Sequence, residues 1–446
     1  MMIFSNDQQK AFPDRNLSKT ALNSFWSPHH PWFIFLLFAS YGPSIQIIGQ
    51  LRFTEAILLL IGAFHAKNIW RSTARNELFF AGLFVFTAFC YGLFDFINQG
   101  ITATTLKKIG TYGLLSLEFL IITWMIDKRS DRIFAALLGF CLSFVIVMTF
   151  KITIPNNSFH DHPWLVGLGE ALTIIPLVLI AALPRHRLYF FSILLVVTFF
   201  HLYYGSRNLS LTTFALWALV AFAALFGSRQ PKPFSWPKFL QLAVISGAGL
   251  ALLITGFFVL LKGAAMPDPM AQKLTRQMDS EFSVVVTARP DVAAAMIGIT
   301  KKPLLGYGSG LVDDEVFDNY AKFSSGGHYS IYIEVINHKP TRDSNPSHSH
   351  LFGAWLDAGF IAAISWVMVV IFCLRLLVIF SYFRSPIMPL TVFIAMSTIW
   401  DILFSPGPNR VEMSLALVFL FLVLYKFQYT SSSAEAKPAR GSPKGK

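Results

Sequence analysis

The chain has 446 residues, of which 54% are hydrophobic and 13% are charged, and its mean hydropathy is +0.55. Because soluble domains carry about 25% charged residues, this composition excludes a soluble globular protein and indicates a polytopic membrane protein. The net charge of +12 does not indicate nucleic-acid binding, since the basic residues form no groove-like stretch interleaved with aromatic residues.

Residues 1–30 are polar and show no apolar core followed by a cleavage site, so we expect a cytoplasmic segment and no removable signal peptide. Apolar runs without strand-like alternation follow along most of the chain, and each is expected to be a transmembrane helix in an all-α fold. About twelve spans are expected, at residues 31–48, 53–65, 78–97, 110–126, 133–150, 171–183, 188–204, 211–226, 239–261, 351–377, 386–403 and 411–425.

The expected spans form two groups, with roughly nine in residues 31–261 and roughly three in residues 350–427. Residues 262–349 connect the groups in one large loop, while residues 428–446 have the composition of a disordered tail. About 21 positive residues fall on one side and roughly six in the short loops opposite, which puts both termini in the cytoplasm and the large loop outside. The three cysteines, Cys90, Cys141 and Cys373, lie in expected spans and are interpreted as packing residues.

Two patterns stand out in the large loop. The stretch "TARPDVAAAMIGI" is expected to be a helix, because Pro290 suits a first turn and Val292, Ala295, Met296 and Ile299 recur at helical spacing. The following "KKPLLGYGSG" predicts a tight turn that approaches another group closely. A phosphate-binding loop is the alternative, although the required Lys-Ser/Thr and preceding strand are missing.

The loop ends at "NPSHSHLFGAWLDAGF", where His348 and His350 stand at the boundary between polar and apolar sequence. Asn345, Ser347 and Ser349 are candidate N-caps for the helix that follows. The positive end of a helix dipole disfavours imidazolium, and a neutral imidazole can accept a proton. Either histidine could instead cap the helix or contact lipid headgroups.

Two arginines are candidates for binding an anion near these histidines. Arg207 lies in "GSRNLSL", in a short outer turn, and Arg289 lies at the start of the predicted loop helix. A guanidinium donates paired hydrogen bonds to diphosphate and stays charged. The alternative for each is a headgroup contact or a surface ion pair.

The patterns around these residues resemble those of the O-antigen ligase and polymerase superfamily, membrane glycosyltransferases that use glycans linked to a polyprenyl diphosphate. The matching features are Arg207 with a leucine four residues later, "ARP" with Arg289 followed by "PLLGYGSG", and His348 with a small polar residue, nine further residues and Gly359. The large outer loop before the last spans also matches.

The resemblance implies an inverting, metal-independent glycosyltransferase without a cofactor, in the lipid-dependent, all-helical class. By resemblance, Arg207 and Arg289 bind the donor diphosphate and His348 activates the acceptor hydroxyl, while His350 has no counterpart and leaves open which imidazole acts. The implied partners are the polyprenyl-diphosphate-linked donor, a lipid A-core or other glycan acceptor, and the bilayer, with no nucleic acid. The implied location is a bacterial inner membrane with a periplasmic active site.

Two alternatives to a ligase remain. An O-antigen or exopolysaccharide polymerase shares the patterns, although the histidine pattern, moderate length and single dominant loop favour a ligase. A transporter or flippase is favoured by acids in the expected spans, because intramembrane carboxylates can couple protons, although helix–helix hydrogen bonding is their simpler role. These acids are Asp95, Glu118, Glu170, Asp357 and Asp401. Against a transporter, the sequence shows no convincing internal repeat.

The charge asymmetry predicts the result of reporter fusions. Fusions after Ala264 and Pro340 are expected to be extracytoplasmic, and fusions after Arg129 and Lys437 cytoplasmic. A cytoplasmic reporter at Ala264 would place the large loop, and with it the candidate site, on the wrong face.

Overall fold

The computed structural model describes residues 27–42, 44–46, 50–149, 164–204, 206–226, 280, 282, 286, 289–309, 313–337, 349–381, 385–405 and 410–435. Helices dominate these residues. Their one sheet is an antiparallel pair, β1 (Ser44–Gln46) and β2 (Gln50–Arg52). A mostly helical fold is therefore confirmed for the described part of the chain.

Four described helices are long and apolar enough to cross a membrane, namely α5 (Arg75–Asn98), α6 (Ala103–Ile126), α7 (Ser130–Thr149) and α17 (His350–Ser381). A fifth span results if α8 (Gly169–Ala182) and α9 (Arg187–Tyr203) are counted together across the 115° bend between them. α18 (Met388–Phe404) is apolar but shorter. These lengths and compositions suit a membrane protein. The expected span 239–261 lies outside the described residues.

The first described helix, α3 (Pro31–Ala39), is shorter than the expected span 31–48. It ends before the sequence "YGP", because proline disfavours helix in the residue that precedes it. Its nine residues rise about 14 Å, which is less than the thickness of a bilayer core. β1, β2 and then α4 (Phe53–Ser72) follow, and α4 is not among the helices long and apolar enough to span.

An ion pair between the buried Glu55 and the partly buried Arg410 ties α4 to α19 (Arg410–Glu435). Arg410 donates from Nε to Glu55 Oε1 at 3.0 Å and from Nη2 to Glu55 Oε2 at 2.9 Å. Its Nε also lies 3.9 Å from Glu118 Oε1 in α6. Paired donation of this kind offsets the cost of burying the Glu55 carboxylate and fixes the geometry of the pair. Three segments distant in sequence are therefore joined at one point.

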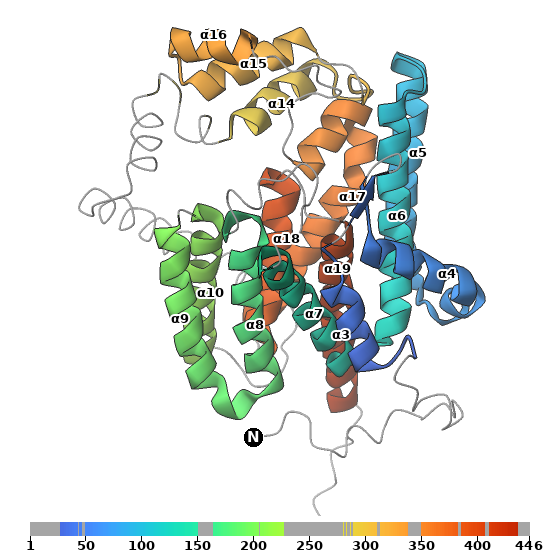
Figure 1. Ribbon diagram of the computed structural model, residues 1–446, viewed down its shortest axis with the longest axis vertical. Helices are drawn as coiled ribbons and strands as arrows, with labels where there is room; N and C mark the ends of the chain where they lie inside the picture. Colours follow the sequence, from blue (N-terminus) through green and yellow to red (C-terminus); the bar gives the residue numbers. More distant parts are fainter. Residues whose placement is uncertain are drawn as a thin grey trace, which may run out of the picture.

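The hairpin formed by α5 and α6 lies along one side of the helical bundle (Figure 1). α17 packs against α5 and α18, and α19 packs against α6. Between α5 and α17 the Thr87 and Ser365 hydroxyl oxygens lie 2.7 Å apart and are buried. In the large loop, α14 (Pro290–Lys301) packs against both α17 and α15 (Asp314–Ser325), and α15 packs against α16 (Tyr329–Asn337).

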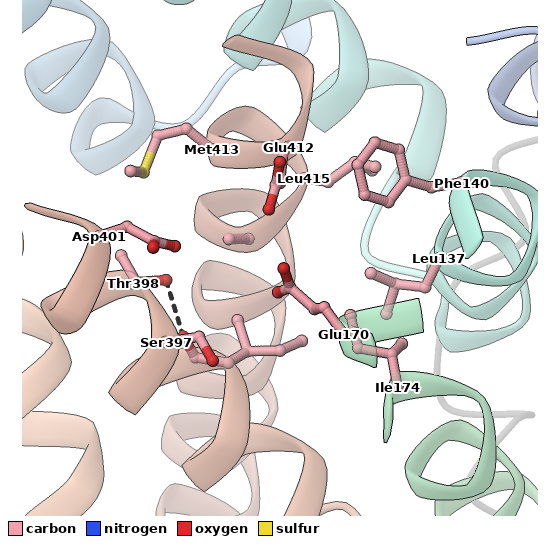
Figure 2. Close-up of a pocket in the computed structure, with 12 residues that line it drawn as sticks. Leu137, Phe140, Glu170, Ile174, Ser397, Thr398, Asp401, Glu412, Met413 and Leu415 are labelled. Carbon is pink, nitrogen blue, oxygen red and sulfur yellow. Dashed lines mark hydrogen bonds between the residues drawn. The ribbon is translucent and has the colours of Figure 1, made fainter. Parts of the chain in front are cut away.

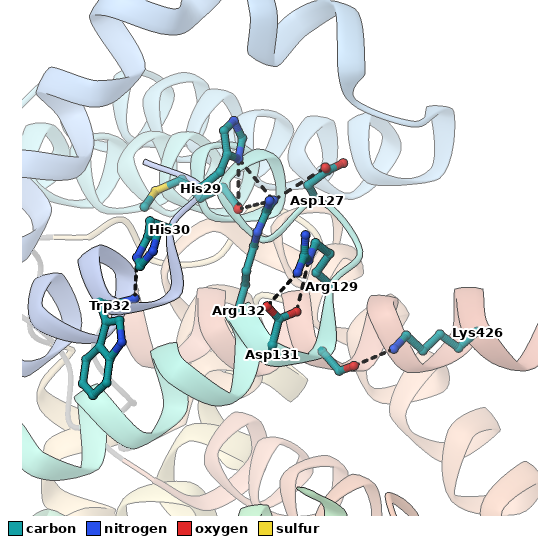
Figure 3. A network of polar contacts seen from close by, with 10 residues as sticks. His29, His30, Trp32, Asp127, Arg129, Asp131, Arg132 and Lys426 are labelled. Carbon is teal, nitrogen blue, oxygen red and sulfur yellow. Dashed lines mark hydrogen bonds and ion pairs between the residues drawn. The ribbon is translucent and has the colours of Figure 1, made fainter. Parts of the chain in front are cut away.

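The turn between α6 and α7 carries the polar network of Figure 3. Arg132 Nη1 lies 3.3 Å from the Met125 carbonyl oxygen and 3.3 Å from His29 Nδ1, while Arg129 donates to both carboxylate oxygens of Asp131. Burial lowers the pKa of His29, although the contact with the Met125 carbonyl opposes this shift. This basic turn lies at the end of the bundle away from α14, α15 and α16 (Figure 1).

α17 contains a reversal that the apolar pattern does not reveal. Ala358 and Gly359 have non-helical backbone angles, with φ of −128° and +71°. The rings of His350 and Trp366 lie 4.5 Å apart, whereas a straight helix would separate these residues by about 24 Å. α17 is therefore a short helix, residues 350–357, folded back on a longer helix, residues 360–381 (Figure 1). This differs from the single continuous span expected at 351–377.

Gly359→Ala is expected to destabilise the protein by more than about 1 kcal/mol, because a side chain is strained at this positive φ. A Cβ at Gly359 would also lie 1.9 Å from the Leu304 carbonyl oxygen. Gly82→Ala in α5 is the matched control, since a Cβ there meets nothing within 4 Å. Thermal unfolding in detergent is expected to show a lower Tm for the Gly359 variant alone. Equal Tm values for the two variants would contradict the reversal.

Candidate functional site

The expected loop helix is confirmed as α14, with Pro290 in its first turn. Val292, Ala295 and Ile299 are buried as expected, while Met296 is exposed. Ala295 and Ile299 share a core with Tyr307, Val316 and Leu356. Because Leu356 belongs to the short helix 350–357, this core joins the large loop to the reversal in α17.

Arg289 immediately precedes α14 and reaches the end of α18. Its guanidinium carbon lies 5.4 Å from the centroid of the Trp400 ring, a cation–π contact. The side chain is half-buried, and burial lowers the pKa of Arg289 while Asp291 opposes the shift. An arginine keeps its charge at neutral pH even so, so a fixed cation lies beside Trp400.

Ser349 anchors the start of the short helix 350–357 at the same end of α18. Its hydroxyl donates to the Ile402 carbonyl oxygen at 2.8 Å and accepts from the Phe352 N–H at 3.1 Å. The second contact confirms the N-cap expected for Ser349. The residue that follows His348 and the guanidinium of Arg289 therefore both contact α18, at positions two residues apart. His348 itself lies outside the described residues, as do Asn345 and Ser347.

Arg207 is the first residue of α10 (Arg207–Phe226), which packs against α18 and α17. Its side chain lies outside the described part of the structure, so the structure does not test whether its guanidinium joins Arg289. The predicted roles of Arg207, Arg289 and His348 stay predictions.

His350 packs against the longer part of α17. Its ring stacks on Trp366, whose Nε1 donates to the Tyr112 hydroxyl at 3.3 Å. The His350 Nε2 atom is buried and has no hydrogen-bond partner among the described residues. This is the environment of a packing residue. Ser349, in contrast, faces α18.

The turn "PLLGYGS", residues 303–309, caps the short helix 350–357. The Tyr307 and Gly308 N–H groups donate to the carbonyl oxygens of Leu356 and Asp357, each at 2.8 Å. The Phe360 N–H donates back to the Pro303 carbonyl at 3.0 Å. These contacts confirm the tight-turn interpretation and not the phosphate-loop alternative, because the N–H groups that would bind phosphate are already used. We call residues 303–309 the capping turn.

The close approach expected of the glycines in this turn is seen at Gly306. A Cβ there would lie 2.6 Å from the Asp357 carbonyl oxygen, and the φ of Gly306 is +66°. Both features require glycine. The two loop patterns identified from the sequence, the glycine-rich turn and the histidine pattern ending at Gly359, are therefore in direct contact.

Two further residues hold this assembly to the α5–α6 hairpin. Asp95 accepts from the Ser309 N–H at 2.7 Å and from the Thr105 hydroxyl at 2.6 Å, and the Ser309 hydroxyl also contacts it. Lys108 Nζ lies 3.1 Å from Asp357 Oδ2. From the sequence, both aspartates are expected only as intramembrane acids, and Lys108 is one of the roughly six positive residues in the short outer loops. Asp95 and Lys108 stand at the facing ends of two consecutive expected helices, and this spacing is the available signal.

A second polar cluster surrounds a small cavity of about 30 Å³ between α8, α18 and α19. Figure 2 shows the carboxyl groups of Glu170, Asp401 and Glu412 directed toward one another. A cavity of this size can hold about one water molecule. Among the described residues no group of His, Cys, Asp and Glu has the arrangement of a metal site. Glu412 was not among the acids expected from the sequence.

No protein-family model matches the chain, and a search of the curated proteins finds no match. The functional interpretation therefore depends on the residue patterns and on the geometry described above.

Replacement of His350 tests its assignment as a packing residue. His350→Ala should lower the Tm, because it removes a ring stack of about 0.5–1.5 kcal/mol, whereas His350→Phe, which keeps a ring, should lower it less. In both variants the activity per folded molecule should change less than about tenfold. Removal of a general acid or base usually lowers the rate by more, about 10² to 10⁴ fold. An unchanged Tm together with loss of activity in both variants would identify His350 as a reacting group.

Proposed function

We propose that the protein is an O-antigen ligase-type glycosyltransferase that moves a glycan from a polyprenyl-diphosphate carrier to lipid A-core. The observation that carries the proposal is the contact between two of the three superfamily-like patterns. The capping turn after Arg289 binds the short helix that begins just after His348, and this helix ends at Gly359. Patterns separated in sequence that build one unit support a shared function.

The position of Arg289 supports the proposed chemistry. In the reaction an acceptor hydroxyl attacks the anomeric carbon, the carbon–oxygen bond to the diphosphate breaks, and the diphosphate leaves with the bonding electrons. Arg289 and Arg207 are proposed to stabilise the negative charge that grows on the diphosphate, a role that a metal ion fills in other enzymes. His348, near the N-terminus of the short helix, is assigned to take the hydroxyl proton.

The proposed architecture is the one expected from the sequence, with about twelve spans and the large loop 262–349 on the periplasmic face of a bacterial inner membrane. Both termini lie in the cytoplasm in this arrangement. The four to five long apolar helices and the basic turn remote from α14 support it.

Kinetics of purified variants in proteoliposomes test the assignment. His348→Ala should lower transfer by roughly 10² to 10⁴ fold. Arg207→Ala and Arg289→Ala should each impair donor binding and kcat, the Lys variants should be milder, and the double Ala variant should be little worse than the poorer single one. Arg185→Ala, at an exposed arginine, is the control and should match the parent.

The same assay tests metal independence, since the chelator EDTA should leave transfer unchanged. Parent-like rates in both arginine-to-alanine variants, or EDTA inhibition reversed by magnesium or manganese, would contradict the mechanism.

A polymerase of the same superfamily is the alternative within the enzyme class. The surface polysaccharide of a deletion strain separates the two. Loss of a ligase leaves long glycan on the carrier lipid, whereas loss of a polymerase leaves single repeat units on the lipid A-core.

A transporter or flippase is a second candidate, favoured by one observation, the carboxyl cluster of Glu170, Asp401 and Glu412 in the helical bundle. Buried acids of this kind can couple substrate movement to protons. Activity in vesicles that requires a proton gradient and is lost in Glu412→Gln would favour this candidate over the transferase.

A further inference from the structure

The short helix 350–357 ends in a way that is unfavourable by itself. Its last carbonyl groups have no partner within the helix, and Asp357 places a carboxylate at the negative end of the helix dipole. Asp357 is also 2% exposed. A buried carboxylate without a compensating cation is strongly unfavourable, so this helix depends on groups supplied by other elements.

The α5–α6 hairpin supplies these groups. Lys108 pairs with Asp357, and its ammonium lies 5.5 Å from the centroid of the Tyr91 ring. Asp95, which is fully buried, holds Ser309 and thereby the capping turn that donates to the helix carbonyls. Asn98 also donates to the Leu305 carbonyl at 3.3 Å. The helix and its cap are thus both fixed to the same hairpin.

The N-terminal end of this short helix lies close to the candidate site. Ser349 joins it to the Ile402 carbonyl, two residues from the Trp400 ring that contacts Arg289. Because a helix is rigid over two turns, a shift at Asp357 is transmitted to Ser349 at its other end. A displacement of about 1 Å at a reacting group can cost about 10² in rate.

We propose that Lys108 and Asp95 are positioning residues, which act through Asp357 and the capping turn to fix the short helix 350–357, with its N-cap Ser349, against the end of α18. The kinetic consequence of this inference rests on the proposed function. Its structural consequence does not. Neither residue is assigned a contact with substrate.

The structural consequence is tested by chemical labelling of a buried position. Ala354, in the short helix, is 1% exposed, and Ala354→Cys is introduced into a chain whose Cys90, Cys141 and Cys373 are replaced by alanine. In the detergent-solubilised protein this cysteine should react slowly with a maleimide. Adding Lys108→Met or Asp95→Asn should speed its labelling about tenfold or more, since each breaks one attachment of the helix.

Two further variants serve as controls. Lys108→Arg keeps the charge and should keep the protection of Ala354→Cys, whereas the exposed neighbour Lys107 can be changed to methionine without effect. Labelling at the parent rate in both Lys108→Met and Asp95→Asn would overturn the proposal.

The kinetic consequence is tested on the same variants with native Ala354. Lys108→Met and Asp95→Asn should lower kcat for glycan transfer roughly 10 to 100 fold while the donor KM changes less than about threefold, because positioning affects the reacting geometry more than binding. Lys108→Arg should recover most of the rate. A lower kcat with unchanged labelling would overturn positioning in favour of a direct role. Faster labelling in a protein whose parent transfers no glycan would keep the structural part and refute the proposed function alone.

Discussion

The reversal of the chain at Gly359 is the constraint on which the rest of the structure depends. A helix that ends inside a membrane protein must find donors for its last carbonyl groups, because lipid provides none. Here the donors are the Tyr307 and Gly308 N–H groups of the capping turn. The large loop must therefore be docked for α17 to reverse, and the reversal in turn brings Ser349 back to the end of α18 beside Trp400.

Hydrogen bonds and ion pairs to buried carboxylates connect segments that are remote in the sequence. Asp95 joins α5 to the capping turn, Lys108 joins α6 to α17, and Arg410 joins α19 to α4. Each pairing offsets the cost of removing a charge from water and specifies which helices meet. Glu118 differs, since its carboxyl oxygens have no hydrogen-bond partner among the described residues, although Arg410 lies nearby. Ionisable groups are thus used both for architecture and, in the proposed site, for chemistry.

Part of this arrangement could be predicted from the sequence. Apolar runs located the long helices, and helical spacing with a first-turn proline located α14, because these signals are local. The reversal in α17 could not be predicted, since the run from Leu351 to Leu377 stays apolar through Gly359 and the donors that stabilise the break lie in another segment. The shortened α3 was predictable in principle from the "GP" that follows it. The partners of Asp95 and Lys108 required the tertiary contacts.

The proposed function requires Arg289 and His348 to act together in glycan transfer from a lipid diphosphate. Reconstitution of the purified protein alone, with a polyprenyl-diphosphate-linked glycan and rough lipopolysaccharide, tests this claim most directly, with the product followed by gel shift. The account predicts that glycan moves from the carrier to the lipopolysaccharide in the absence of divalent metal. Glycan that stays on its carrier under these conditions, while the protein remains folded, would contradict it.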